Sequence, residues 1–170
     1  MSRRSRSREV ALQILFQDDL NPADPPNDAL PFLRQRLNQE DLLTFSAELI
    51  SGVRQHRAAL DNILANFTEH WSVSRMATTD RNILRLAAFE MLFLKTPHRI
   101  AMDEAIELSK RFGTSQSSQF INGILDRVWR EAGDASQNES ASPATEVEPE
   151  GQKPSDPPAE ESQTHSNRSS

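Results

Sequence analysis

Four arginines stand within the first eight residues of the chain, and only serines separate them: Arg3, Arg4, Arg6 and Arg8. A guanidinium group can pair with phosphate through two parallel hydrogen bonds or stack on a base, and arginine-rich segments commonly become ordered when they bind RNA. The spacing therefore predicts a flexible basic arm over residues 1–8 that binds RNA. A terminus that serves only solubility would have the same composition, so both interpretations stand at this point.

Two phenylalanines lie off the apolar faces of the helices predicted around them. At about 100° per residue, Phe120 projects roughly 90° from the centre of its apolar face, and Phe16 roughly 150° from the centre of its own. A ring that faces solvent can stack on an RNA base. The burial preference of phenylalanine favours packing against a second neighbouring helix instead. Both rings are candidate RNA contacts, with helix packing as the alternative.

The sequence lacks the common catalytic patterns. The chain contains no cysteine, which excludes disulfides, thiol nucleophiles and cysteine-ligated zinc. The four histidines lack metal-ligand spacing, and no HExxH, GxSxG, GxGxxG or P-loop pattern occurs. Glu107 with Lys110 and Arg111 has the spacing of ordinary ion pairs on a solvated helix face. We expect a protein that is not an enzyme, with no catalytic residue, metal or cofactor.

The negative charge of the chain is concentrated in its last segment. Residues 133–170 carry eight acidic side chains against two basic ones, which accounts for the whole formal net charge of −6. The rest has equal numbers of acidic and basic side chains, so the acidic total does not argue against nucleic-acid binding. Residues 133–170 contain no Phe, Trp, Ile or Leu and are rich in Ser, Glu, Pro and Gln. This composition predicts a disordered tail.

Apolar residues recur at helical spacing in seven segments, and no sustained strand-like alternation appears. Residues 83–94 are apolar nearly all round, broken only by Arg85 and Glu90, which indicates a central buried helix. We therefore predict one all-α domain over residues 9–132, between the arm 1–8 and the tail 133–170. Its helices are expected at about 8–20, 30–37, 42–53, 57–67, 79–94, 101–112 and 115–128.

The N-terminus has positive charge but no apolar segment of signal-peptide length. No stretch approaches the roughly 20 apolar residues that are needed to span a bilayer. We expect a cytoplasmic protein that does not contact a membrane.

Several segments together resemble the NusB family over about residues 3–130. They are the arginine arm running into REVALQILFQ, then DRNILRLAAFEML, IAMDEAIELSKRFG and SSQFINGILDRV. The resemblance implies two packed helical subdomains. It also implies a transcription antitermination factor that binds the boxA element of nascent ribosomal RNA together with NusE, a ribosomal small-subunit protein. The complex would join RNA polymerase and other Nus factors and carry transcription through terminators.

The resemblance also implies roles for individual residues. Arg4, Arg6 and Arg8 fall in what looks like the RNA-binding arm of the family. Phe16, Arg85 and Phe120 resemble positions that line its RNA surface, and Asp80 resembles an acidic position on the side that faces NusE. Phe16 stands where some relatives have tyrosine, which keeps the ring but loses a hydroxyl donor.

Two other functions are compatible with a domain of this kind. Some ribosomal RNA cytosine methyltransferases carry a similar N-terminal domain, so the chain could be a remnant of such an enzyme. That enzyme would need a Rossmann-type domain and a catalytic cysteine, and this chain has neither the length nor any cysteine. A helical module that binds only proteins, through the surface of the central helix, is the other alternative.

Overall fold

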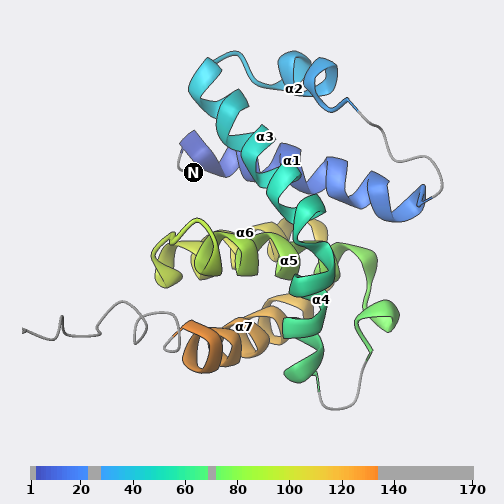
Figure 1. The fold of residues 1–170 in the computed structure, drawn as a ribbon, viewed down its shortest axis with the longest axis vertical. Coiled ribbons are helices and arrows are strands. Elements are labelled where there is room, and N and C mark those ends of the chain that lie inside the picture. The colour runs from blue at the N-terminus through green and yellow to red at the C-terminus, as the bar shows by residue number, and fades with distance from the viewer. Residues whose placement is uncertain (1–2, 23–27, 69–71, 134–170) are drawn as a thin grey trace, which may run out of the picture.

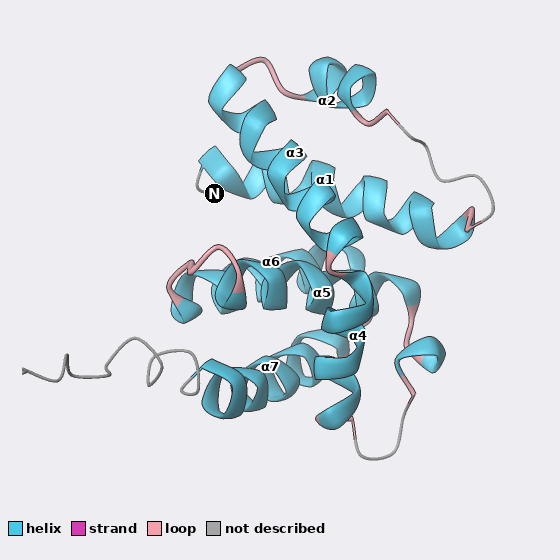
Figure 2. Ribbon diagram, viewed as in Figure 1, coloured by secondary structure: helices cyan, strands magenta, loops and turns pink. Residues whose placement is uncertain are grey.

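The computed structural model describes residues 3–22, 28–68 and 72–133. These residues form seven α-helices, one 3₁₀ turn (η1, Val73–Arg75) and a closing π-helical turn (η2, Trp129–Gly133), without any strand in the described ranges (Figures 1 and 2). The prediction of an all-α fold is confirmed. The predicted tail lies outside the described residues, apart from Gly133 at the end of η2. The helices are α1 (Arg3–Leu20), α2 (Leu30–Arg36), α3 (Glu40–Gln55), α4 (Arg57–Asn66), α5 (Thr78–Leu92), α6 (His98–Phe112) and α7 (Ser117–Val128).

The helices form two packed groups, as the resemblance implied. Helices α1, α2 and α3 make up the upper group in Figure 1, and α4 leads from α3 into the lower group of α5, α6 and α7. Helix α5 contacts α1, α3, α4, α6 and α7, so it joins the two groups. Every residue from Asn82 to Met91 is buried, which confirms the predicted central helix.

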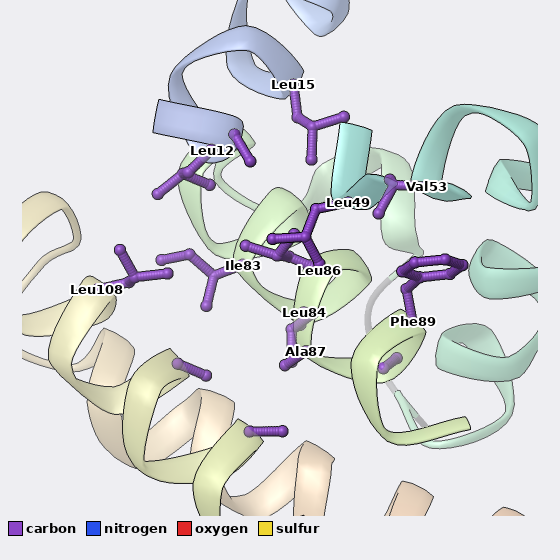
Figure 3. Packing of buried hydrophobic residues seen from close by; sticks show 14 of the residues in the cluster. Leu12, Leu15, Leu49, Val53, Ile83, Leu84, Leu86, Ala87, Phe89 and Leu108 are labelled. Carbon is purple, nitrogen blue, oxygen red and sulfur yellow. The ribbon is translucent and has the colours of Figure 1, made fainter. Parts of the chain in front are cut away.

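One hydrophobic core extends through both groups. Leu12 and Leu15 of α1 and Leu49 of α3 project toward α5 in Figure 3. The side chains of Ile83 and Leu84 on α5 are fully buried. Because each fully buried aliphatic side chain contributes about 1.5–3 kcal/mol, this core is the main source of stability. It fixes the position of the polar side chains that surround it.

Helices α3 and α5 come close together at Gly52. A Cβ atom placed on Gly52 would lie 1.9 Å from Cζ of Phe89, which is far inside van der Waals contact. The Phe89 ring is 4% exposed and stacks on Phe93 at 5.5 Å and on His56 at 5.9 Å between ring centroids. The ring therefore has little room to move, and glycine is the residue that permits this helix crossing.

Replacing Gly52 with alanine is expected to lower the free energy of unfolding by about 1–3 kcal/mol, because the added methyl group overpacks the core. The matched control is Gly123→Ala on α7, since a Cβ there would meet no atom of the described residues within 4 Å. That exposed substitution should instead stabilise the protein by about 0.5–1 kcal/mol through helix propensity. Urea unfolding of both variants measures the difference. Equal shifts in both variants would contradict the crossing described here.

Candidate functional site

The N-terminal arginines do not form a flexible arm in the described residues, because helix α1 already begins at Arg3. The serines between the arginines explain the difference. Ser7 is buried, its hydroxyl donates to the carbonyl of Leu42 at 2.9 Å, and its own carbonyl accepts a hydrogen bond from the Ser46 hydroxyl at 3.0 Å. Contacts of this kind with α3 hold the first two turns of α1 in place. The prediction of a flexible arm is therefore wrong for residues 3–8.

Three of the four arginines keep their charged groups at the surface. Arg3 is 68% exposed at its side chain and contacts Asp41 of α3 at 3.4 Å. Arg4 is exposed and lies over the Phe45 ring, 4.7 Å from its centroid. Arg6 is 43% exposed and pairs with Glu9 one turn later at 2.7 Å. These side chains form a basic surface at the start of α1.

Arg8 differs from its neighbours because its side chain is only 4% exposed. Its Nε and Nη2 donate to the two carboxylate oxygens of Glu90 on α5 at 2.8 and 2.6 Å. Glu104 of α6 lies 3.7 Å from its Nη1. The prediction that Arg8 contacts RNA is not supported by this geometry, because the guanidinium is enclosed by the Phe45 ring of α3 and by the carboxylates of α5 and α6. Its role in the structure is to neutralise Glu90 in the core.

Arg85 is also buried, with 4% of its side chain exposed. Its guanidinium donates two parallel hydrogen bonds to Asp61 of α4 at 2.7 and 2.8 Å and a further one to Asp19 of α1 at 3.0 Å. Burial lowers the pKa of Arg85, but Asp61 and Asp19 outweigh this effect and place the pKa above its ordinary value. Arg85 therefore links α1, α4 and α5 from inside and does not line a surface, contrary to the expectation.

Phe16 lies in an open depression of about 470 Å³ between the end of α1, α2, α5 and α6. Phe32 and Phe112 share its wall, and Phe112 is 38% exposed. Thr79, in the first turn of α5, also lines this depression. Phe16 is half-buried, so part of its ring remains available to a ligand.

Phe120 lies in a second depression of about 320 Å³, together with Asp80, Arg75 and Ser117. Phe120 is half-buried and packs against the edge of the core. Asp80 is 8% exposed, and its Oδ1 has no hydrogen-bond partner among the described residues. A buried carboxylate oxygen without a donor costs free energy, so this atom is a candidate to accept a hydrogen bond from a bound partner.

The first turn of α5 joins the two depressions, because Thr79 lines one and Asp80 lines the other. Phe16 and Phe120, which are far apart in the sequence, are thereby placed on either side of one helix start. Of the predicted site residues, the fold brings Phe16, Asp80 and Phe120 to this joint surface. It places Arg3, Arg4 and Arg6 at the other end of α1, and it buries Arg8 and Arg85.

The predicted ion pairs of α6 are partly local and partly tertiary. Lys110 pairs with Glu107 at 2.7 Å, as the spacing predicted, and this contact lowers the pKa of Glu107. Arg111 reaches across to Glu9 of α1 at 2.8 Å. Helical spacing within α6 could not have identified that partner, which is 102 residues away.

The described part of the chain holds no group of three or more His, Asp or Glu side chains placed to bind a metal ion. Within residues 3–22, 28–68 and 72–133, no helix combines the length and the apolarity that crossing a membrane requires.

Comparison with known proteins identifies the family. The model of the NusB family matches residues 5–130. The chain belongs to the NusB family. A NusB relative from Bdellovibrio bacteriovorus, called transcription antitermination protein NusB, is 41% identical over 130 residues, which cover 75% of this chain and 96% of the relative. A relative of the same name from Desulfosudis oleivorans is 44% identical over 138 residues, 78% of this chain and 89% of its own.

Solved NusB structures have the same fold. The structure of T. maritima NusB is 33% identical, with a TM-score of 0.70, and the match covers 81% of this chain and 98% of that one. A chain from the crystal structure of the antitermination factors NusB and NusE in complex with dsRNA has a TM-score of 0.68 at 23% identity, over 76% of this chain and 98% of that one. At that identity the likeness establishes the NusB fold.

Proposed function

We propose that this protein is a transcription antitermination factor of the cytoplasm that binds boxA RNA of nascent ribosomal RNA together with NusE. It then joins the RNA polymerase complex with other Nus factors. The observation that carries this proposal is the match to the NusB family across residues 5–130, nearly all of the described chain. The protein acts by binding alone and has no catalytic step of its own.

The RNA surface consists of the exposed arginines and the two half-buried rings. Arg3, Arg4 and Arg6 present guanidinium groups at the start of α1, where they meet phosphates. Phe16 and Phe120 offer ring faces on which bases can stack. Arg8 and Arg85 lie in the interior behind this surface, where their ion pairs fix α1 against α4 and α5.

Asp80 belongs to the protein-binding side of the surface. Its buried Oδ1, which has no hydrogen-bond partner among the described residues, lies in the depression that also contains Phe120. A donor from NusE, such as an amide, ammonium or guanidinium group, would satisfy this oxygen and make the interface specific. RNA and NusE would then both bind at the first turn of α5.

The test is a gel-shift titration of boxA RNA with this protein, with and without NusE. We expect weak binding by the protein alone, tighter binding with NusE, and a steep decrease in affinity as salt rises. Phe120→Ala should weaken binding roughly 5- to 150-fold, because one base–aromatic stack contributes about 1–3 kcal/mol.

The matched control is Phe93→Ala. Phe93 is also a partly exposed phenylalanine, 39% exposed, and it follows the other end of α5. This variant should bind RNA like the unmodified protein.

If the protein shifts no RNA even with NusE but still binds NusE, the alternative of a purely protein-binding module is correct. The observation that favours that second candidate is the Asp80 oxygen, which lacks a hydrogen-bond donor in the part of the chain that the structure describes.

A further inference from the structure

Two arginines from different helices share one buried carboxylate beside the depression that contains Phe16. Arg6 of α1 donates from Nη1 to Oε1 of Glu9 at 2.7 Å, and Arg111 of α6 donates from Nη1 to Oε2 of the same residue at 2.8 Å. The Glu9 side chain is 6% exposed, whereas each arginine side chain is 43% exposed. The carboxylate is therefore enclosed, and the two cations lie at the surface on either side of it.

The cluster places two guanidinium groups at the surface around one enclosed carboxylate. Arg6 and Arg111 each pair with Glu9, and each keeps 43% of its side chain exposed. Glu107, one turn before Arg111 on α6, is neutralised by Lys110. Two guanidinium groups held close together repel each other, and an added anion relieves that repulsion. Phosphate suits such a pair because guanidinium groups bind its oxygens in a bidentate manner.

The cluster is next to an aromatic wall. Glu9 precedes Gln13 by one helical turn and Phe16 by two turns on the same side of α1, about 6 and 10 Å along the helix axis. The guanidinium of Arg111 lies over the ring of its neighbour Phe112, 5.3 Å from the centroid. Phe112 and Phe16 line the same depression. A cationic pair beside an aromatic wall matches the two parts of a nucleotide, its phosphate and its base.

We propose that Arg6 and Arg111, held together by Glu9, form a phosphate site for the RNA backbone at the edge of the depression lined by Phe16 and Phe112. This inference rests on the proposed function, and it adds Arg111 to the RNA surface as a binding residue and Glu9 as a positioning residue. The RNA enters from the start of α1, with a backbone phosphate on the arginine pair and the adjoining base against the rings.

The experiment measures the affinity of the full chain with NusE for boxA RNA at several salt concentrations. Arg111→Ala should weaken binding several-fold and reduce the slope of log affinity against log salt by about 0.7, the value for one lost phosphate contact on a single strand. Arg6→Ala should do the same. Arg111→Lys keeps the charge but loses the bidentate geometry, so its affinity should lie between those of the alanine variant and the unmodified protein.

The matched control is Arg99→Ala. Arg99 is an exposed arginine near the start of α6, about 18 Å along the helix from Arg111. This variant should leave the affinity within about twofold and the salt slope unchanged. Thermal unfolding of all variants shows whether they fold. If Arg111→Ala does not fold, Arg111→Lys still tests the phosphate site.

The outcomes separate this inference from the proposed function. If the unmodified protein fails to bind boxA RNA with NusE, the proposed function itself is wrong. If it binds but Arg111→Ala behaves like Arg99→Ala, only the phosphate site is overturned. NusE binding to Arg111→Ala is also measured without RNA. If that binding is lost while the salt slope for RNA is unchanged, the phosphate site is likewise overturned, because the cluster would then bind an acidic protein segment.

Discussion

Replacing Arg8 with alanine is expected to lower the free energy of unfolding by about 3–5 kcal/mol, the usual cost of breaking a buried ion pair by removing one partner. Glu90 has 2% of its side chain exposed and accepts both hydrogen bonds from Arg8. Without that partner, the Glu90 carboxyl group would be buried without the cation that binds both of its oxygens. Equilibrium unfolding in urea or guanidinium chloride measures the loss.

Two further variants show whether the cost comes from the unpaired charge. The double substitution Arg8→Met with Glu90→Met should recover most of the stability, because apolar side chains of similar volume replace a buried ion pair at little or no cost. Arg4→Ala removes an exposed arginine of the same helix, and its contact with the Phe45 ring contributes only about 0.5–1 kcal/mol. An Arg8→Ala variant of normal stability with reduced RNA affinity would mean that Arg8 is a direct RNA contact after all.

Replacing Asp19 with alanine is expected to have an effect of similar size, about 3–5 kcal/mol. The Asp19 side chain is 1% exposed and accepts hydrogen bonds from Arg81 at 2.9 Å and from Arg85 at 3.0 Å, and it also pairs with Arg57. Its removal leaves these three arginines converging on one place without the carboxylate that attracts them. The control is Asp103→Ala, an exposed aspartate on α6, which should change stability by less than about 0.5 kcal/mol.

The ion pairs of Asp19 also predict how stability depends on pH. Burial raises the pKa of Asp19, but Arg85, Arg81 and Arg57 outweigh this effect and hold the pKa below its ordinary value of 3.8. In the folded protein Asp19 therefore stays ionised at a pH where the unfolded chain is already protonated. Its contribution is complete above about pH 4 and is lost as the pH falls through the lowered pKa of the folded state.

Urea unfolding at a series of pH values between neutral and strongly acidic measures this contribution. The unmodified protein should lose stability below about pH 4, and Asp19→Asn should lose less over the same interval because the titrating group is gone. A parallel decrease in both proteins would assign the acid sensitivity to other carboxylates.

Arginine has two roles in this protein, one at the surface and one in the interior. Exposed arginines at the start of α1 carry the proposed RNA surface, and buried arginines on α1 and α5 hold the helices that present it. Residue type and spacing are the same for Arg6 and Arg8, yet Arg6 is 43% exposed and Arg8 is 4% exposed at the side chain. Two residues along a helix correspond to a rotation of about 200°, which takes one side chain to the surface and the other toward α5.

The sequence alone predicted the helices, the central position of α5 and the family. Helical periodicity depends on residues three and four apart, so a local pattern was sufficient for α5 and for the Glu107–Lys110 pair. It was insufficient for the first two turns of α1, because their contacts with α3 involve serine hydroxyls and not an apolar stripe. The helical wheel correctly placed Phe16 and Phe120 away from the centres of their apolar faces, and both rings are half-buried.

Only the tertiary structure decided which of the predicted site residues reach solvent. Arg8 and Arg85 are buried because their carboxylate partners, Glu90 and Asp19, lie 82 and 66 residues away in the sequence. The pairing of Arg111 with Glu9 likewise spans 102 residues. Ion pairs between helices depend on how those helices pack, and packing is set by the shared apolar core, so residue spacing within one helix carries no information about such partners.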